Sequence, residues 1–391
     1  MHRVAYRIAL CLCMIFLVSC HKAVDKRIVV FDPLKDYPEF PLTLYDVAEV
    51  RFIKLGGEEE NIYYTSTLGT TPFIDETNDR LFLANRFIGI LEYSLNGNYI
   101  RTLGRIGRGP GEYSSVFFYV QPEEKTVGIY DNGQRHILTY NYNGDYLRDR
   151  GKDVYFVITS SNNFHIYENA LVYYNPYSLV SDEYQGITFS TSSRTLYSIP
   201  INGRSAKDIK DIHYERPIVN PSDWGPNYEF LMLSGYLIPS YSGLIMSTYR
   251  SDTTFVIEKD MSWRPFLVNS RHNGVKEGCL YPVAETREYL FLCHKNNLRE
   301  GRVSYFAIDK KTKLAYKITK DESSPLHGLL QGKIQIDIEG LTKNPDYRFW
   351  EFDPEKLKKT CYDLLSPELK TIVDHCDEGS NPILMVMKFK E

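Results

Sequence analysis

The chain has 391 residues, of which 43% are hydrophobic and 25% are charged, a composition typical of a globular protein with a large core. Its formal net charge of −4 leaves no basic surplus to hold phosphates, so we expect no nucleic-acid partner. The chain has 31 tyrosines, which favours a protein rich in β-strands because aromatic side chains pack well on a pleated, half-buried sheet surface. Exposed tyrosines would offer a sugar or a protein partner a stacking ring with a polar tip.

The first 19 residues have the features of a signal peptide. Arg3 and Arg7 form a short positive region, and an uninterrupted apolar run follows over residues 8–18. This run is shorter than the ~20 residues that a bilayer-spanning helix needs, and it fits the apolar core of a leader. The run ends in Leu17-Val18-Ser19-Cys20, which resembles a lipobox. We therefore predict a lipoprotein signal peptide over residues 1–19, cut before Cys20.

Lipidation of Cys20 is what the lipobox resemblance implies. Several acyl chains on one residue give a stable anchor, since each buried CH₂ adds about 0.8 kcal/mol. His21 follows the cysteine instead of Asp, which by analogy with lipoprotein sorting argues against retention in the inner membrane. We expect an outer-membrane protein, anchored in the cell envelope by its lipid, on either the periplasmic or the cell-surface face.

Four cysteines remain after the leader and the lipidated Cys20: Cys279, Cys293, Cys361 and Cys376. An exported protein can form disulfides, but four cysteines allow three pairings and the sequence does not choose among them. No His and Cys spacing suggests zinc, and we expect no cofactor and no metal.

The body of the chain is predicted to consist of strands arranged in a repeat. Residues 20–45 hold several X-Pro pairs and are expected to form a lipidated tether and lead-in. From residue 46 to residue 391, short β-rich runs alternate with turn signals. Residues 73–104 resemble residues 119–151 at an offset of 46 to 47 residues. Such a period suits one β-propeller blade of three or four short antiparallel strands.

The repeat predicts how the strands turn and how the ring closes. Asn96-Gly97 in one copy matches Asn143-Gly144 in the other, which predicts tight type I′ hairpins. Dividing the body by the period gives an all-β, six-bladed β-propeller, with seven blades as the alternative. Residues 47–55 could supply a strand that pairs with the other end of the chain and closes the ring.

A small C-terminal helical hairpin is predicted as an insertion over residues 353–376. Asp353-Pro354 and Ser366-Pro367 are typical of a capping residue followed by Pro at the first helical position. Apolar residues then follow at helical spacing and include Cys361 and Cys376. A disulfide between these two cysteines and two buried free thiols both fit this arrangement.

Several segments resemble known propellers. Residues 97–113 (GNYIRTLGRIGRGPGEY) resemble the blade-ending motif of NHL-type propellers. More closely, the chain resembles the uncharacterised six-bladed β-propeller lipoproteins of Gram-negative gut bacteria. Residues 46–55, 251–260 and 381–390 are similar to the opening, mid-chain and closing strands of that family. The resemblance covers most of the mature chain and implies its fold and location, but that family has no agreed activity.

The glycine-rich run is the first of three motifs that suggest chemistry. Gly104, Gly107, Gly109 and Gly111 invite comparison with a phosphate loop, but Glu112-Tyr113 follow where a Walker loop needs Lys and Ser or Thr. We interpret the run as a turn between blades, in which glycines adopt positive φ.

The other two motifs lie at the ends of predicted strands. Asn85 and Asp131 occupy matched positions in the repeat, where they could line a binding surface, although Asn and Asp are also ordinary turn-capping residues. Asp252-Thr253-Thr254 fits a bacterial O-glycosylation motif, which an unshifted intact mass of the native protein would exclude. No catalytic residue is predicted.

These observations favour a binding or scaffold module of the cell envelope. Its partner would be a glycan, a peptide or an envelope protein on a propeller face or at the channel mouth. The alternative is a carbohydrate-active lyase or hydrolase with its site in the channel, because propellers host both kinds of function. A third hypothesis is a subunit of a nutrient-uptake system.

Overall fold

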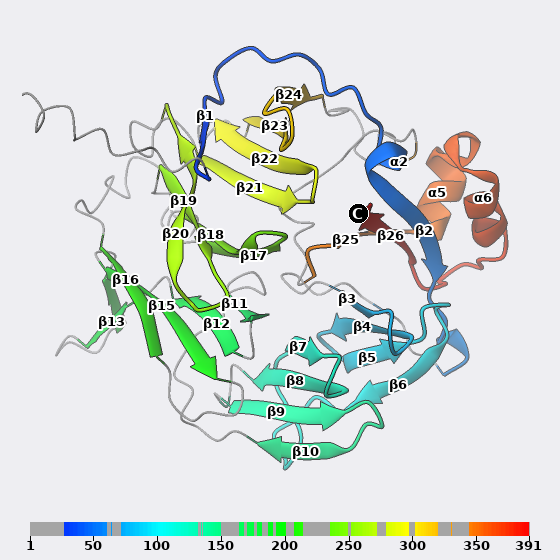
Figure 1. Cartoon of the computed structure of the whole chain (residues 1–391). Helices are drawn as coiled ribbons and strands as arrows, with labels where there is room; N and C mark the ends of the chain where they lie inside the picture. The colour runs from blue at the N-terminus through cyan, green and yellow to red at the C-terminus, as the bar shows by residue number, and fades with distance from the viewer. Residues whose placement is uncertain are drawn as a thin grey trace, which may run out of the picture.

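The computed structural model describes residues 27–60, 64, 72–131, 134, 136–149, 164–167, 170–175, 178–181, 187–190, 193–200, 207–213, 235–248, 252–271, 279–296, 302–319, 330 and 344–390. The predicted signal peptide and Cys20 lie outside these residues. The chain forms a β-propeller, with its sheets arranged around a ring (Figure 1). This confirms the all-β propeller class.

Five sheets have four or five strands each and form complete blades. In chain order, the strands of the first two are β3 (Phe73–Asp75), β4 (Arg80–Asn85), β5 (Gly89–Tyr93) and β6 (Tyr99–Leu103), then β7 (Phe117–Gln121), β8 (Thr126–Asp131), β9 (His136–Asn141) and β10 (Tyr146–Asp149). Those of the third are β11 (Phe164–Tyr167), β12 (Ala170–Asn175), β15 (Ser193–Pro200) and β16 (Lys207–His213), with a separate hairpin of β13 (Ser178–Ser181) and β14 (Ile187–Ser190) between β12 and β15.

The fourth and fifth blades follow in the same antiparallel pattern. Their strands are β17 (Gly235–Ser240), β18 (Gly243–Thr248), β19 (Thr253–Ile257) and β20 (Trp263–Asn269), then β21 (Cys279–Glu285), β22 (Tyr289–Asn296), β23 (Arg302–Asp309) and β24 (Ala315–Ile318).

A three-stranded sheet joins the two ends of the chain. It is ordered β2-β26-β25, with β2 at Ala48–Lys54, β25 at Tyr347–Phe352 and β26 at Ile383–Phe389. Strand β2 pairs antiparallel with β26 over its whole length, so an early strand completes the sheet that the last strand forms. The pairing predicted for residues 47–55 is confirmed.

The predicted count of six or seven blades is wrong. The described residues form five blades of four or more strands, and the three-stranded closing sheet fills the remaining sector (Figure 1). Dividing the body by a period of 46 assumed that every residue serves a blade. Instead, the chain uses residues for the β13–β14 hairpin and for the helices that lie between β25 and β26.

The Asn-Gly turns lie where the repeat predicts them, but their type differs. Gly97 and Gly144 have φ of 84° and 88°, whereas neither Asn96 nor Asn143 has positive φ. A type I′ turn would need positive φ at both positions. Each hairpin instead carries a register shift next to the turn, which is typical of a turn whose Gly forms a bulge.

The helices include the predicted C-terminal pair. Helix α5 (Pro354–Thr360) and helix α6 (Pro367–Asp374) are joined by the short 3₁₀ helix η6 (Tyr362–Leu364). The Asp353 and Ser366 side chains accept backbone N–H bonds of the first turns, as their sequence positions predict. Two further short helices are α2 (Leu44–Val47) and η1 (Glu58–Glu60), and no described helix is long and apolar enough to span a membrane.

Cys361 and Cys376 lie buried as free thiols in the core beneath this helical pair. Of the two arrangements compatible with the sequence, the structure therefore contains the free thiols. Cys293 is also a buried free thiol, and the side chain of Cys279 lies outside the described residues.

Part of the predicted tether belongs to the propeller. Strand β1 (Val29–Phe31) pairs in parallel with β20 and becomes the fifth strand of the fourth blade. The chain then runs across the fifth blade to α2, as the blue segment in Figure 1 shows. Phe40 donates its backbone N–H to Lys317 and is buried in the core of the fifth blade and the closing sheet. Residues 27–40 are called the N-terminal strap below.

Candidate functional site

A tight turn carries an exposed tyrosine at the edge of the fourth blade. Strands β17 and β18 pair up to Ser240 and Gly243, so Tyr241 and Ser242 form the tip of the hairpin. The side chain of Ser240 closes the turn by donating to the Gly243 carbonyl at 2.8 Å. Tyr241 is 59% exposed, so most of its ring surface faces solvent.

The turn is fixed by a carboxylate of the neighbouring blade. Glu285 ends the inner strand β21 and is only 4% exposed. Its two oxygens accept the Ser242 backbone N–H at 2.9 Å and the Ser242 hydroxyl at 2.7 Å. Lys310 donates to the same carboxylate at 2.8 Å. A buried carboxylate is stable only when it is paired and hydrogen-bonded in this way, so Glu285 holds the Tyr241 turn rigidly.

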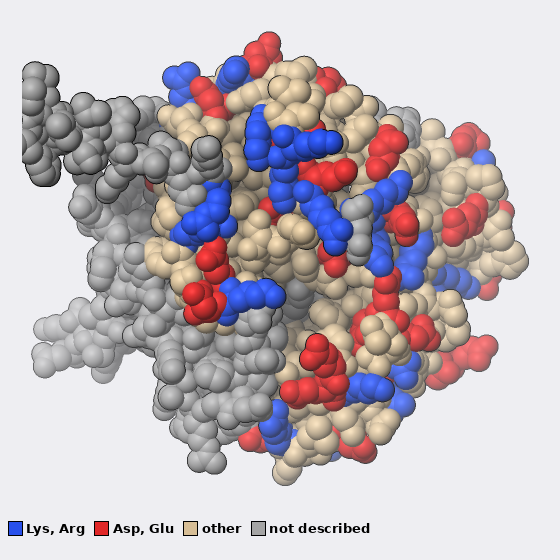
Figure 2. Space-filling model, in the orientation of Figure 1, with Lys and Arg blue, Asp and Glu red and all other residues tan. Residues whose placement is uncertain are grey.

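Two cations lie against the tyrosine ring. The Lys310 ammonium is 4.8 Å from the ring centroid and the Arg287 guanidinium is 5.8 Å from it. Both distances are within the range of cation–π attraction. On the face drawn in Figure 2, Lys and Arg side chains gather above the fifth blade, from which both cations come. The ring is therefore held in position while more than half of its surface faces solvent.

The turn borders a hollow of about 510 Å³. The other residues that line it come from the ends of β11, β17 and β18 and from the β19–β20 turn, and they are Tyr167, Ser240, Ser242, Gly243, Glu258, Lys259 and Asp260. A side chain at position 243 would meet the Ile257 carbonyl at 2.6 Å and the Tyr167 hydroxyl at 3.1 Å. Gly243, at φ 137°, is therefore required for the close approach of these groups.

The acidic groups of the hollow accept hydrogen bonds. The Ser262 hydroxyl and backbone N–H hold the pKa of Asp260 below its usual value. Glu258 accepts a hydrogen bond from Arg264 at 2.7 Å. Carboxylates accept hydrogen bonds only, while the Lys259 ammonium donates only, so the hollow offers both functions beside an aromatic ring. This combination can bind a polyhydroxylated ring, whose apolar face stacks while its hydroxyls bond to the charged groups.

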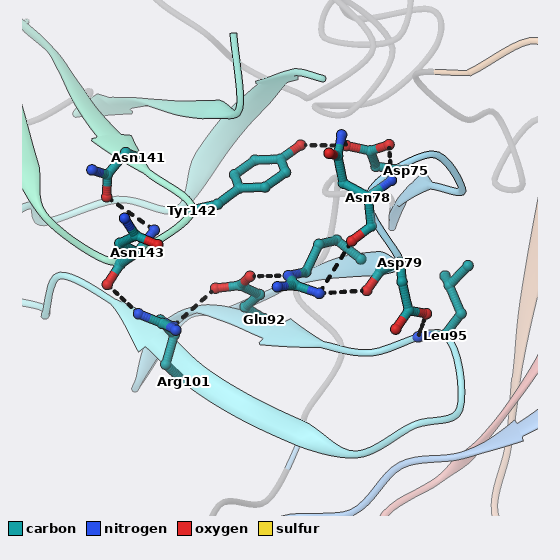
Figure 3. Close-up of polar contacts among 10 residues, drawn as sticks. Asp75, Asn78, Asp79, Glu92, Leu95, Arg101, Asn141, Tyr142 and Asn143 are labelled. Carbon is teal, nitrogen blue, oxygen red and sulfur yellow. Dashed lines mark hydrogen bonds and ion pairs between the residues drawn. The ribbon is translucent and has the colours of Figure 1, made fainter. Parts of the chain in front are cut away.

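A second charged cluster lies in the first blade and is structural. Glu92 is fully buried on β5, where it pairs with Arg80 at 2.6 Å and with Arg101 at 3.3 Å (Figure 3). Nearby, Asp75 accepts a hydrogen bond from Tyr142 of the second blade at 2.6 Å, and Arg101 donates to the backbone of the β9–β10 turn. The groups of this cluster bind one another, so the network joins two blades instead of opening to a ligand.

A family model agrees with the propeller just described. The model described as "Domain of unknown function (DUF4934)" matches residues 39–388. The chain belongs to this family. No curated protein matches the chain significantly.

Several solved structures are similar to this DUF4934 chain. One is a Bacteroides fragilis protein described as exported, with a TM-score of 0.61, 17% identity, and coverage of 93% of this chain and 100% of that one. A member of the DUF4221 family from Bacteroides vulgatus has a TM-score of 0.46 and 12% identity, covering 88% and 97%. A Bacteroides thetaiotaomicron protein of unknown function has a TM-score of 0.38 and 12% identity, covering 88% and 76%. At these identities the first likeness shows the fold alone.

The matched strand-end residues of this DUF4934 chain are turn caps. Asn85 is 1% exposed and accepts the backbone N–H groups of Phe87 and Ile88. Asp131 is fully buried and accepts bonds from Ser114 and Gln134. Asn85 caps the turn that follows it, as the capping interpretation predicts, and Asp131 caps its own turn and also ties it to the Ser114 segment. Neither side chain lines the hollow.

The glycine-rich run is a loop whose backbone is bound by the side-chain carboxylate of Glu112. Gly104 and Gly111 have positive φ, as predicted for a turn between blades. The Glu112 side chain folds back over the loop, accepts the Gly109 N–H at 2.8 Å and pairs with Arg105. An anion could bind these N–H groups only by displacing Glu112, so the structure agrees with the turn interpretation.

The remaining predicted motif lies at the start of β19. The Thr253 hydroxyl donates to Asp252 at 2.8 Å, and Thr254 is buried. Glycosylation there stays a prediction. The described residues contain no group of three or more His, Cys, Asp and Glu side chains placed to hold a metal ion.

Sequence patterns alone did not identify Tyr241, Glu285 or Lys310 as a site. One signal could have found the tyrosine: Ser240-Tyr241-Ser242-Gly243 separates two apolar runs, and an aromatic residue at the tip of a short turn cannot be buried by its own hairpin. No comparable signal exists for Glu285 and Lys310, because they reach the turn from another blade.

Proposed function

We propose that the protein is a binding module of the cell envelope that holds a glycan in the hollow beside Tyr241. The observation that carries this proposal is the exposed ring of Tyr241, fixed at the tip of a turn by the buried Glu285 carboxylate. A ring that is already held loses little entropy when a ligand stacks on it, which favours binding. The volume of the hollow is within the ~300–1,000 Å³ typical of small-ligand sites.

The proposal includes attachment to the outer membrane through lipid on Cys20. The lipobox-like sequence Leu17-Val18-Ser19-Cys20 supports it. A lipid at this position would keep the propeller at the envelope, where glycans of the cell surface or the medium are available. Whole-protein mass spectrometry of the membrane fraction tests the anchor, because acyl chains on Cys20 add a defined mass to the chain that begins there.

A glycan array tests the ligand, using the chain from His21 because it keeps every described residue. We expect saturable binding to one class of glycan without its cleavage. Cleavage of the bound glycan would contradict the binding function and favour the alternative lyase or hydrolase. Binding to no glycan on a broad array, with a folded protein, would contradict the glycan as ligand.

A further inference from the structure

The strap and the fifth blade enclose a second, larger cavity of about 820 Å³. Phe31 and Tyr37 of the strap stack on each other at 5.2 Å, and both pack edge-on against Phe306 of β23. The backbone of Lys317 exchanges hydrogen bonds with Pro38 and Phe40. The strap is thus firmly seated, and the cavity rim is a fixed surface.

The rim of this cavity carries exposed apolar side chains. Val30 and Leu314 line the cavity and are 61% and 56% exposed, and Leu34, one residue before the lining residue Lys35, is 60% exposed. These three are among only nine large apolar side chains that are exposed in the described part of the chain. A soluble monomer usually scatters such residues singly, whereas a group of them marks an interaction surface.

The same rim is basic although the chain as a whole is acidic. The cavity is lined by five basic residues, Arg27, Lys35, Arg264, Lys310 and Lys313, and by only two acidic ones, Asp36 and Glu285. The formal net charge of the whole chain is −4. Arg27 and Arg264 both pair with Glu258, and Lys310 pairs with Glu285. Lys35, whose ammonium lies 5.7 Å from the Tyr37 ring centroid, and Lys313 form no ion pair with any described residue. Figure 2 shows the Lys and Arg side chains clustered over this blade.

The described part of the chain begins at this rim. Arg27, the first described residue, lines the cavity, and Cys20 precedes it by seven positions. An extended chain spans about 3.3–3.6 Å per residue, so a lipid on Cys20 would hold the rim within about 25 Å of the membrane. Exposed apolar residues and unpaired lysines would then face lipid headgroups.

We propose that this rim, formed by the strap and the β23–β24 turn, is a membrane-docking surface that binds an anionic lipid surface. Lys35 and Lys313 contact the headgroups, and Val30, Leu34 and Leu314 enter the interface. Basic residues near an anionic bilayer are attracted within a Debye length, and apolar neighbours add burial. This surface adjoins the Tyr241 turn, because Ser242 lines both hollows, but Tyr241 itself does not line this cavity. Membrane docking of this surface is a separate function from the proposed glycan binding.

Co-sedimentation with vesicles tests the docking, using the chain from His21 so that no lipid anchor contributes. We expect binding to equimolar phosphatidylcholine and phosphatidylglycerol vesicles and little binding to phosphatidylcholine alone. The double variant Lys35→Glu/Lys313→Glu should lower the partition coefficient roughly tenfold, and Val30→Ser/Leu34→Ser should lower it severalfold. Lys125→Glu/Lys356→Glu changes charge equally at two exposed lysines outside the rim and should bind like the unmodified chain.

Several results would overturn the proposal: no binding to either vesicle, equal binding to both, or equal effects of the rim and control variants. Binding to an acidic peptide such as polyglutamate without binding to vesicles would also overturn it and favour an acidic protein partner. Raising the salt from about 0.05 M to about 0.5 M should release the unmodified chain, since screening shortens the Debye length. Vesicle binding of the unmodified chain that persists at high salt would contradict docking. This test needs no variant, so it holds even if a variant fails to fold. The Tyr241→Ala variant should still bind vesicles, so failure of glycan binding and failure of docking can be distinguished.

Discussion

Ala48 lies opposite Phe389 in the antiparallel ladder between β2 and β26, and the ladder continues to the pair Lys54 and Ile383. The early strand β2 is therefore an integral part of the sheet that ends the chain. The pairing covers one edge of β26 and one edge of β2, each of which would otherwise be a template for aggregation. It also makes the stability of the ring depend on a strand far away in sequence.

Weakening this closure should destabilise the whole propeller. Ile53 is 3% exposed on β2 and packs between the closing sheet and the first blade. We expect Ile53→Ala to lower the free energy of unfolding by about 2–5 kcal/mol, because it removes buried methyl groups and leaves a cavity. Urea unfolding followed by tryptophan fluorescence measures the change.

The control for this substitution is Glu49→Ala on the same strand. Glu49 is exposed, so its replacement should change the free energy of unfolding by no more than about 0.5 kcal/mol. Equal effects of both substitutions would show that β2 is not anchored as described.

The buried Glu92 cluster should be structurally necessary. Glu92→Ala removes the carboxylate that pairs with Arg80 and Arg101 and leaves two guanidinium groups without it. We expect a loss of about 2–4 kcal/mol in the free energy of unfolding. The variant Glu92→Gln keeps the shape and an acceptor oxygen and should lose less. A loss below about 0.5 kcal/mol in Glu92→Ala would contradict the role of the cluster in joining the blades.

The stabilising contact of Glu112 in the glycine-rich loop should weaken at low pH. The bonds from the Gly109 N–H and from Arg105 hold the pKa of Glu112 below its ordinary value of 4.5. A carboxyl with a lowered folded pKa stabilises the fold above its ordinary value, and this contribution is lost as pH falls through the folded pKa. The difference in unfolding free energy between the unmodified chain and Glu112→Gln should therefore shrink between about pH 6 and about pH 3. A difference that stays constant over this range would contradict the contact.

The buried thiols should be unreactive in the folded protein. Burial raises the pKa of the Cys376 thiol, which lowers its thiolate fraction. We expect an alkylating reagent to leave Cys361 and Cys376 unlabelled in native protein and to label both after denaturation without reductant. Labelling that requires a reductant would show a disulfide between them instead.

Much of the fold could be predicted from local sequence patterns. Three features follow from local sequence: the matching turn positions of Gly97 and Gly144 in the repeat, the caps Asp353 and Ser366, and the closing strand. The number of blades could not be predicted, because the helices and the β13–β14 hairpin interrupt the repeat without a common signal. The turn type at Asn96 depended on a bulge in the facing strand, which a dipeptide does not specify.

The candidate site could be predicted only in part. Tyr241 stands at a turn that the sequence marks, but its role depends on Glu285 and Lys310, which lie 44 and 69 positions further along. Contacts between blades are set by how whole sheets pack, and no short motif encodes them. The repeat aligns Asn85 with Asp131 and so suggests both as candidate binding residues, but in the structure both side chains accept hydrogen bonds from the backbone.

The central claim is that the Tyr241 ring binds a glycan, and calorimetric titration with the glycan selected by the array tests it most directly. Tyr241→Ala should weaken binding roughly tenfold, which corresponds to about 1.4 kcal/mol, whereas Tyr241→Phe should keep most of the affinity because it keeps the ring. Tyr45→Ala, at a tyrosine 49% exposed on α2, should bind like the unmodified chain. Unchanged affinity in Tyr241→Ala, or an equal loss in Tyr45→Ala, would contradict the claim.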